Sequence, residues 1–155
     1  MQALNRSGET LEVAGYASLF DIEDQGGDLV RAGAFAEGLK ARGPNGVRML
    51  FQHDATEPVG VWDEIAEDGR GLYVRGRILS TAPRGKAALG LVAEGAVDGL
   101  SIGFRTIHSA PRPGGGRDLL QLDLWEVSIV TFPMLAQARL RVVEPNKARL
   151  SASAA

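Results

Sequence analysis

Cysteine is absent from this 155-residue chain, which excludes disulfides, thiolate metal sites and a cysteine nucleophile. No apolar run approaches the ~18 residues that a membrane-spanning helix needs, and the opening MQALNRSGET lacks the apolar centre of a secretory signal. A basic excess is also missing, because 17 Lys and Arg face 19 Asp and Glu. We therefore expect a soluble protein that stays inside the cell, with neither nucleic acid nor membrane as a partner.

Ligand-binding motifs are equally scarce. The two histidines, His53 and His108, lack the spacing of metal ligands, and no G-x-x-x-x-G-K-[ST] loop is present to bind phosphate. Four acidic residues give one loop the composition, but not the spacing, of a calcium site: Asp21, Glu23, Asp24 and Asp28. We interpret that loop as solvated, and we expect no metal and no cofactor.

What the sequence does contain is a series of strand patterns interrupted by two helical stretches. Strands are expected at residues 10–18, 47–53, 59–66, 71–79, 100–108, 119–132 and 140–143. Helices are expected at residues 34–41 and 83–96. Asp68-Gly69 predicts a hairpin turn. One domain at residues 10–144 is expected, between an N-terminal extension (1–9) and a flexible tail (145–155).

The string Gly99-Leu100-Ser101-Ile102-Gly103 fits the pattern G-x-S-x-G. Strand alternation puts Ser101 on the face opposite the apolar residues, and the glycines would leave its backbone uncovered for a substrate. The pattern alone favours an ordinary solvent-facing serine. An α/β-hydrolase is excluded, because a strand pattern rather than a helix follows Ser101, and His108 comes too soon after it.

Two further residues make a nucleophilic serine plausible. His53 continues the apolar face of the expected strand 47–53, so we expect it to be partly buried. Glu126 interrupts an apolar face of the strand 119–132, where a carboxylate needs a partner such as an imidazole N–H. Each has an ordinary alternative, a structural histidine and a glutamate at a fraying edge. Together with Ser101 they are the groups that acyl transfer requires.

Five segments, in order along the chain, resemble the HK97-type phage prohead protease family. They are GYASLFDIEDQGGDLVRAGAF (15–35), FQHDATEPVGVW (51–62), DGRGLYVRGRI (68–78), DGLSIGF (98–104) and DLWEVSIVTFP (123–133). The resemblance implies a mostly β (α+β) fold, an antiparallel β-barrel flanked by a few helices, as in the herpesvirus assembly proteases. It implies a serine endopeptidase that cleaves a scaffold protein, or the scaffold-like segment of the major capsid protein, during procapsid maturation.

The resemblance also implies roles for single residues: Ser101 as nucleophile, His53 as general base and Glu126 as the third catalytic member. Asp54 and Asp98 compete for the third role, because each neighbours one of the other two residues. His108 lies outside the matching segments.

The remaining expectations concern the oxyanion and the partners. Backbone N–H groups near Ser101 would bind the oxyanion, with Arg139 or Arg141 assisting. The capsid or scaffold protein would be the substrate, a homodimer follows by analogy with the herpesvirus enzymes, and the place of action is the procapsid in the host bacterial cytoplasm. The particle would be a phage or a gene-transfer-agent-like relative. The rival hypothesis is a non-catalytic assembly factor that binds extended segments by edge-strand pairing.

Overall fold

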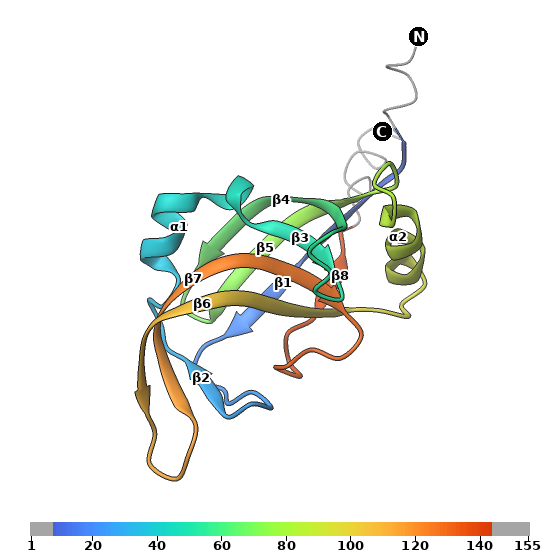
Figure 1. The fold of residues 1–155 in the computed structure, drawn as a ribbon. Helices are drawn as coiled ribbons and strands as arrows, with labels where there is room; N and C mark the ends of the chain where they lie inside the picture. Colours follow the sequence, from blue (N-terminus) through green and yellow to red (C-terminus); the bar gives the residue numbers. More distant parts are fainter. Residues whose placement is uncertain (1–7, 144–155) are drawn as a thin grey trace, which may run out of the picture.

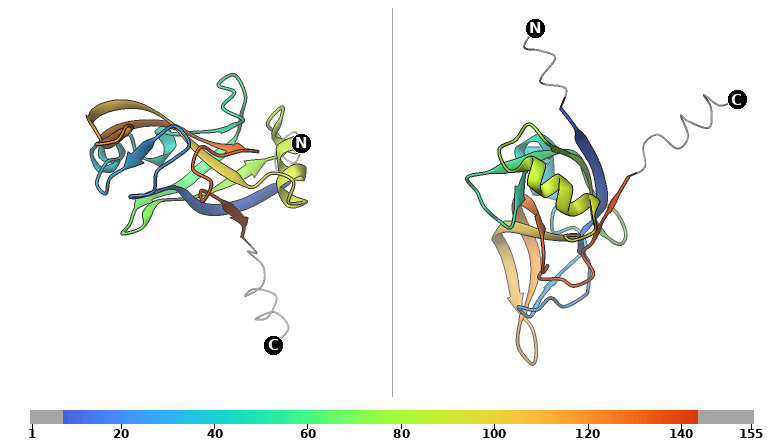
Figure 2. Two further views of the ribbon diagram at one scale, coloured as in Figure 1. Left: turned by 90° about the horizontal axis from the view of Figure 1, so that it is seen from below. Right: turned by 90° about the vertical axis from the view of Figure 1, so that its right-hand side faces the viewer.

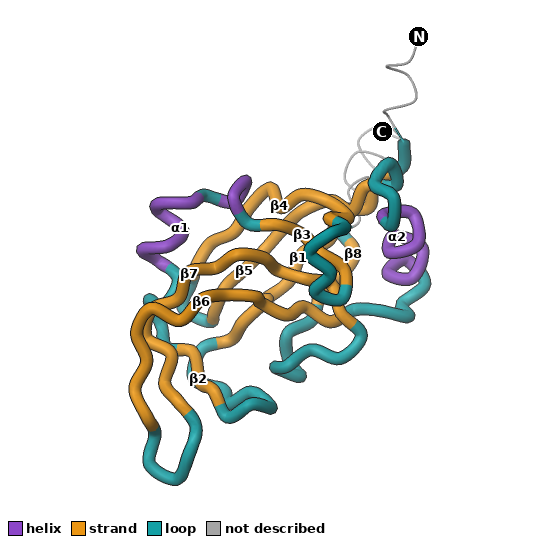
Figure 3. The backbone as a smooth tube through the Cα atoms, viewed as in Figure 1, coloured by secondary structure: helices purple, strands orange, loops and turns teal. Residues whose placement is uncertain are grey.

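One curled sheet of eight strands dominates the computed structural model, which describes residues 8–143 (Figures 1 and 3). The predicted tail (145–155) and residues 1–7 of the predicted N-terminal extension lie outside the described residues. The domain limits therefore stay a prediction. No helix among the described residues is long and apolar enough to cross a membrane.

The strands follow the order β2-β7-β3-β4-β5-β1-β8, and β6 pairs with the other edge of β7. Their bounds are β1 Thr10–Leu19, β2 Asp28–Val30, β3 Arg48–Phe51, β4 Pro58–Glu67, β5 Gly71–Leu79, β6 Gly99–Pro111, β7 Arg117–Val130 and β8 Leu140–Val142. The pairs are antiparallel except for β2–β7 and β3–β7, which are parallel. Figure 2 shows the curl of the sheet from two further sides.

The curled sheet is closed into a ring at one end. Gly99, at the start of β6, forms an isolated antiparallel bridge with Arg139, just before β8. The N–H of Leu100 donates to the carbonyl of Ala138 over 2.9 Å. Because β8 also pairs with β1, the chain of neighbours returns to β6. The predicted barrel-like, mostly antiparallel architecture is confirmed, with the two parallel pairs as additions.

Two helices cover the ends of the sheet (Figure 1). Helix α2 (Gly85–Ala93) packs Ala88, Leu89 and Val92 into the core. Helix α1 (Ala36–Arg42) has no buried residue. Both are shorter than predicted; α2 stops three residues early because Gly95 has a φ of 79°, which ends the helical run.

The predicted hairpin is confirmed, whereas one strand was missed. Asp68 Oδ1 accepts the N–H groups of Arg70 and Gly71 over 2.8 and 3.1 Å, which fixes the turn between β4 and β5. Strand β2 lies at the end of the segment that we expected to be a loop. Three residues are too few for alternation to reveal, and β2 exists because it pairs with the start of β7.

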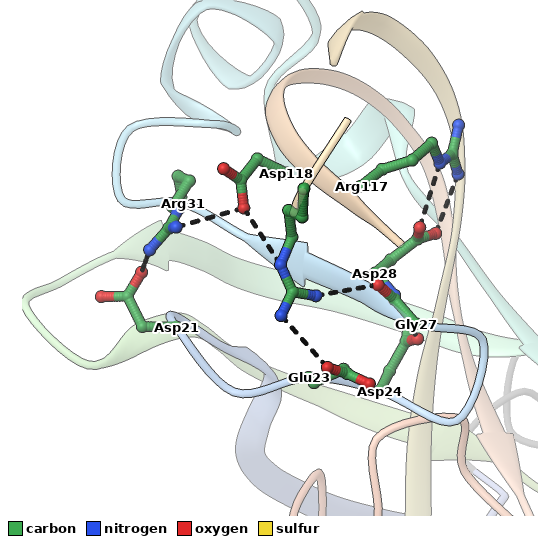
Figure 4. Close-up of polar contacts among 9 residues, drawn as sticks. Asp21, Glu23, Asp24, Gly27, Asp28, Arg31, Arg117 and Asp118 are labelled. Carbon is green, nitrogen blue, oxygen red and sulfur yellow. Dashed lines mark hydrogen bonds and ion pairs between the residues drawn. The ribbon is translucent and has the colours of Figure 1, made fainter. Parts of the chain in front are cut away.

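The acidic loop is largely exposed, as expected, and three of its four carboxylates also pair with arginines (Figure 4). Salt bridges join Arg31 to Asp21 at 2.8 Å, Arg112 to Glu23 at 3.1 Å and Arg117 to Asp28 at 2.8 Å. Two of these arginines flank the β6–β7 hairpin loop. The glycine-rich hairpin therefore contacts this chain's own acidic loop.

Candidate active site

The pairing of β6 with β7 puts the predicted serine and glutamate on one face of the sheet. Ser101 lies directly opposite Ser128, and Gly103 lies opposite Glu126. Side chains of opposed residues in an antiparallel pair project to the same side, with Cβ atoms about 4.5–5.5 Å apart. Ser101 and Glu126 are thus neighbours on one surface, separated by one step along the strands.

His53 does not lie on a strand, contrary to the sequence-based expectation. Strand β3 ends at Phe51, and the next two residues, Gln52 and His53, have φ values of 55° and 61°. Left-handed backbone costs a non-glycine residue about 1–2 kcal/mol, so other contacts must hold the turn. The Gln52 side chain supplies one, because its Nε2 donates to Thr131 Oγ1 over 2.7 Å.

Helix α2 holds the same turn from the other side, through a residue at its N-terminus. The guanidinium of Arg84 lies 5.5 Å from the ring centroid of Phe51. It also forms ion pairs with Asp54 at 3.3 Å and Glu57 at 3.2 Å. Hydrogen bonds from Thr56 and the charge of Arg84 lower the pKa of Asp54. Asp54 therefore stabilises the turn that carries His53.

His53 and Glu126 meet side chain to side chain. His53 Nδ1 lies 2.5 Å from Glu126 Oε2, so a proton on Nδ1 is shared with the carboxylate. The Glu126 side chain is 13% exposed and that of His53 is 42% exposed. The hydrogen bond to Glu126 raises the pKa of His53, against the opposing effect of burial. The imidazole partner expected for Glu126 is present, although His53 is more exposed than predicted.

The other candidates have different partners. Asp98 Oδ1 accepts a hydrogen bond from Arg139 Nη1 over 2.7 Å, and Arg139 Nε donates to the carbonyl of Ala136. His108 lies further along β6, opposite Gln121. None of the hydrogen bonds within residues 8–143 joins Asp54 or Asp98 to His53. Glu126 is the carboxylate that holds the imidazole.

Ser101 is 6% exposed and lines a cavity of about 130 Å³. The cavity lies between β1 and β6, and Leu100, Ile102 and Leu135 add apolar surface to it. The hydrogen bonds of the described part of the chain include none from Ser101 to His53. Catalytic hydrogen bonds are often long before substrate binds, so the absence of this bond is compatible with a nucleophile and its base.

The glycines that flank Ser101 make room for this protein's own atoms. A Cβ at Gly103 would lie 2.2 Å from Glu126 Oε2, and one at Gly99 would lie 2.7 Å from Pro133 Cδ. We expected the two glycines to uncover the backbone for a substrate, but the space beside them is filled by Glu126 and Pro133. Gly103 is the position over which the Glu126 carboxylate lies.

Ser128 is a polar residue of the site that the sequence analysis did not single out. It is fully buried, and its hydroxyl donates to Glu126 Oε1 over 2.6 Å. The available signal was its position two residues after Glu126, which puts both on one face of a strand. Among residues 8–143, no group of three or more His, Cys, Asp or Glu side chains is arranged to hold a metal ion.

The sequence of this chain is similar to those of phage proteins. A family described as Caudovirus prohead serine protease matches residues 2–151. The prohead protease of Enterobacteria phage HK97 is 39% identical over an alignment of 139 residues, and the match covers 84% of this chain. The chain spans 59% of the length of that relative.

Two solved structures share the fold at low sequence identity. A KSHV protease in complex with a hexapeptide phosphonate inhibitor superimposes with a TM-score of 0.61 at 15% identity, covering 92% of this chain and 69% of that one. The capsid assembly protease gp21 of bacteriophage T4 gives a TM-score of 0.60 at 14% identity, covering 77% and 80%. These likenesses establish the herpesvirus-protease-like fold.

Proposed function

Since this chain belongs to the Caudovirus prohead serine protease family, we propose that it is a serine endopeptidase of procapsid maturation. Its substrate is the scaffold-like segment of the major capsid protein, or a separate scaffold protein, cleaved inside the procapsid in the host cytoplasm. One observation carries the proposal: the His53–Glu126 pair lies on the face of the sheet that also carries Ser101.

The proposed reaction uses three groups in sequence. Ser101 Oγ attacks the scissile carbonyl while His53 Nε2 takes its proton, and the carboxylate of Glu126 holds the Nδ1 proton. The resulting tetrahedral intermediate expels the amine, which receives the proton from His53, and an acyl-enzyme forms on Ser101. Water then attacks the ester by the same proton transfer and releases the new carboxyl end.

The cavity beside Ser101 supports a peptide substrate. A closed apolar cavity of ~150 Å³ can hold benzene, so the 130 Å³ here suits one medium-sized side chain next to the scissile bond. The cavity lies between β1 and β6, beside the nucleophile, so an extended segment along β6 could place one side chain in it. A homodimer remains a prediction by analogy.

Co-expression with the major capsid protein of the same particle tests the proposal. Intact masses of both proteins are compared for the wild type, Ser101→Ala, His53→Ala and the exposed-serine control Ser109→Ala. We expect the capsid protein to shorten at one defined bond with the wild type and the control, and to stay full length with the first two variants. Processing by both of those variants would overturn the assignment.

The non-catalytic assembly factor predicts a different result. In that case every co-expression leaves the capsid protein full length, while the two proteins still purify together. Replacing Ser101 then has no effect on the mass of either protein.

A further inference from the structure

We propose that Ser128 is the positioning residue of this site, which sets both the Glu126 carboxylate and the His53 backbone in their working arrangement. The inference rests on the proposed function, because it concerns the groups that would activate Ser101. It adds a residue that makes no contact with substrate in the mechanism above.

Ser128 contacts both members of the pair through one hydroxyl group. Its O–H donates to Glu126 Oε1 over 2.6 Å, while its oxygen accepts the backbone N–H of His53 over 3.1 Å. Glu126 Oε2 contacts the His53 ring. The four groups form a closed ring of contacts: imidazole, carboxylate, hydroxyl and histidine backbone.

Each of the two Ser128 hydrogen bonds prevents a movement that would displace the imidazole of His53. A carboxylate held at one oxygen can rotate away, and the bond from Ser128 to Oε1 leaves Oε2 directed at the imidazole. His53 has left-handed backbone, so its N–H needs an acceptor that stays in place. A misplacement of about 1 Å can cost a hundredfold in rate, so holding these groups in place should raise the rate of the reaction.

Ser128 is a positioning group rather than a second nucleophile. Its side chain is fully buried, whereas Ser101 is 6% exposed and lines the cavity. The Ser128 proton is also committed to Glu126, whose other oxygen holds the base. An incoming carbonyl carbon could reach Ser101 but not Ser128.

The first test measures how fast an alkyl fluorophosphonate labels Ser101. In that reaction Ser101 Oγ bonds to phosphorus, the P–F bond breaks, and fluoride leaves while His53 takes the serine proton. We expect Ser128→Ala to slow labelling by roughly ten- to a hundredfold. Ser128→Thr keeps the hydroxyl, so its labelling rate should be closer to that of the wild type. The control Ser109→Ala should be labelled at the wild-type rate.

The second test detects positioning without any turnover. NMR titration of the imidazole resonances follows His53, with His108 as an internal reference on β6. Because Glu126 raises the pKa of His53, a carboxylate that turns away in Ser128→Ala should let that pKa fall toward its ordinary value. A merely structural serine would change the melting temperature and leave the His53 titration as in the wild type.

The outcomes separate this inference from the proposed function. Wild-type labelling rate and an unchanged His53 titration in Ser128→Ala would overturn the role of Ser128 alone. Labelling that persists in Ser101→Ala, or a wild type that the probe does not label, would contradict the proposed nucleophile. The NMR titration would still decide whether Ser128 holds Glu126 against His53.

Discussion

Glu126 is a carboxylate with 13% of its side chain exposed, and each of its two oxygens has one partner. Burying a charge without partners is costly, whereas charge-assisted hydrogen bonds are roughly twice as strong as neutral ones. His53 and Ser128 supply those bonds at 2.5 and 2.6 Å. The two partners that make the buried carboxylate tolerable are therefore the proposed base, His53, and the serine that holds Glu126 against it.

Replacing Glu126 by glutamine should affect both the rate and its pH dependence. Loss of the orienting carboxylate costs a serine triad roughly ten-thousandfold in turnover, and we expect a loss of that order here. The base must be neutral, and Glu126 raises the pKa of His53. The acid limb of kcat/KM should therefore move to lower pH in Glu126→Gln. If the acid limb of kcat/KM stayed at the same pH, a group other than His53 would be responsible for it.

Gly103→Ala should lower activity even though the substitution replaces no polar residue. The new methyl would lie 2.2 Å from Glu126 Oε2, so the carboxylate must move away from His53. We expect a loss of activity of about a hundredfold or more, measured with the same fluorophosphonate probe. Gly69→Ala is the matched control, since a Cβ there meets nothing within 4 Å. Equal rates for the two variants would contradict this role of Gly103.

At the scale of elements, local signals predicted most of the fold. The Asp68-Gly69 turn and strand alternation predicted the β4–β5 hairpin, with β5 bounds that match those observed. The sequence analysis did not predict the β2 strand or the left-handed turn at His53, because both depend on partners that are distant in the sequence. Nothing local marks Gln52 and His53 as left-handed, since glycine is the residue that usually takes that conformation.

The glycines of α2 offer a matched pair of stability predictions. Gly90 is exposed within the helix, and a Cβ there meets nothing within 4 Å. Gly90→Ala should raise the free energy of unfolding by about 1 kcal/mol, because alanine favours helix. At Gly85 a Cβ would lie 1.7 Å from the carbonyl oxygen of Leu79, so Gly85→Ala should lower it by about 1–3 kcal/mol. Urea unfolding of both variants checks the opposite signs.

Across the whole molecule, the site draws on parts of the chain that are far apart in sequence. The turn after β3 supplies His53, β6 supplies Ser101 and β7 supplies Glu126, while Arg84, the residue just before α2, holds the turn. Alternation could place each residue on a face of its own strand. It could not give the register that sets Gly103 opposite Glu126, because register is a property of two strands. The three residues were grouped by the chemistry that acyl transfer requires and by the family resemblance, without knowledge of the register.

The His53–Glu126 pair should also appear in the stability of the whole molecule. The folded pKa of His53 is raised, so the pair stabilises fully below the unfolded value of 6.5 and loses that contribution as pH rises through the folded value. The deficit in unfolding free energy of Glu126→Gln should therefore be larger near pH ~6 than near pH ~9. Urea titrations at both values test this, and a deficit that grows with pH would contradict the sign.

Asp68 should give the opposite trend at acid pH. The hydrogen bond from Tyr16 and the turn N–H groups lower the pKa of Asp68 below 3.8. Its contribution is present above that unfolded value and is lost as pH falls through the lowered one. Asp68→Asn should thus be less stable than the wild type near pH ~7, with the two curves converging near pH ~2. Urea titrations at both pH values test this, and a stability gap that stays the same from pH ~7 to pH ~2 would contradict the linkage.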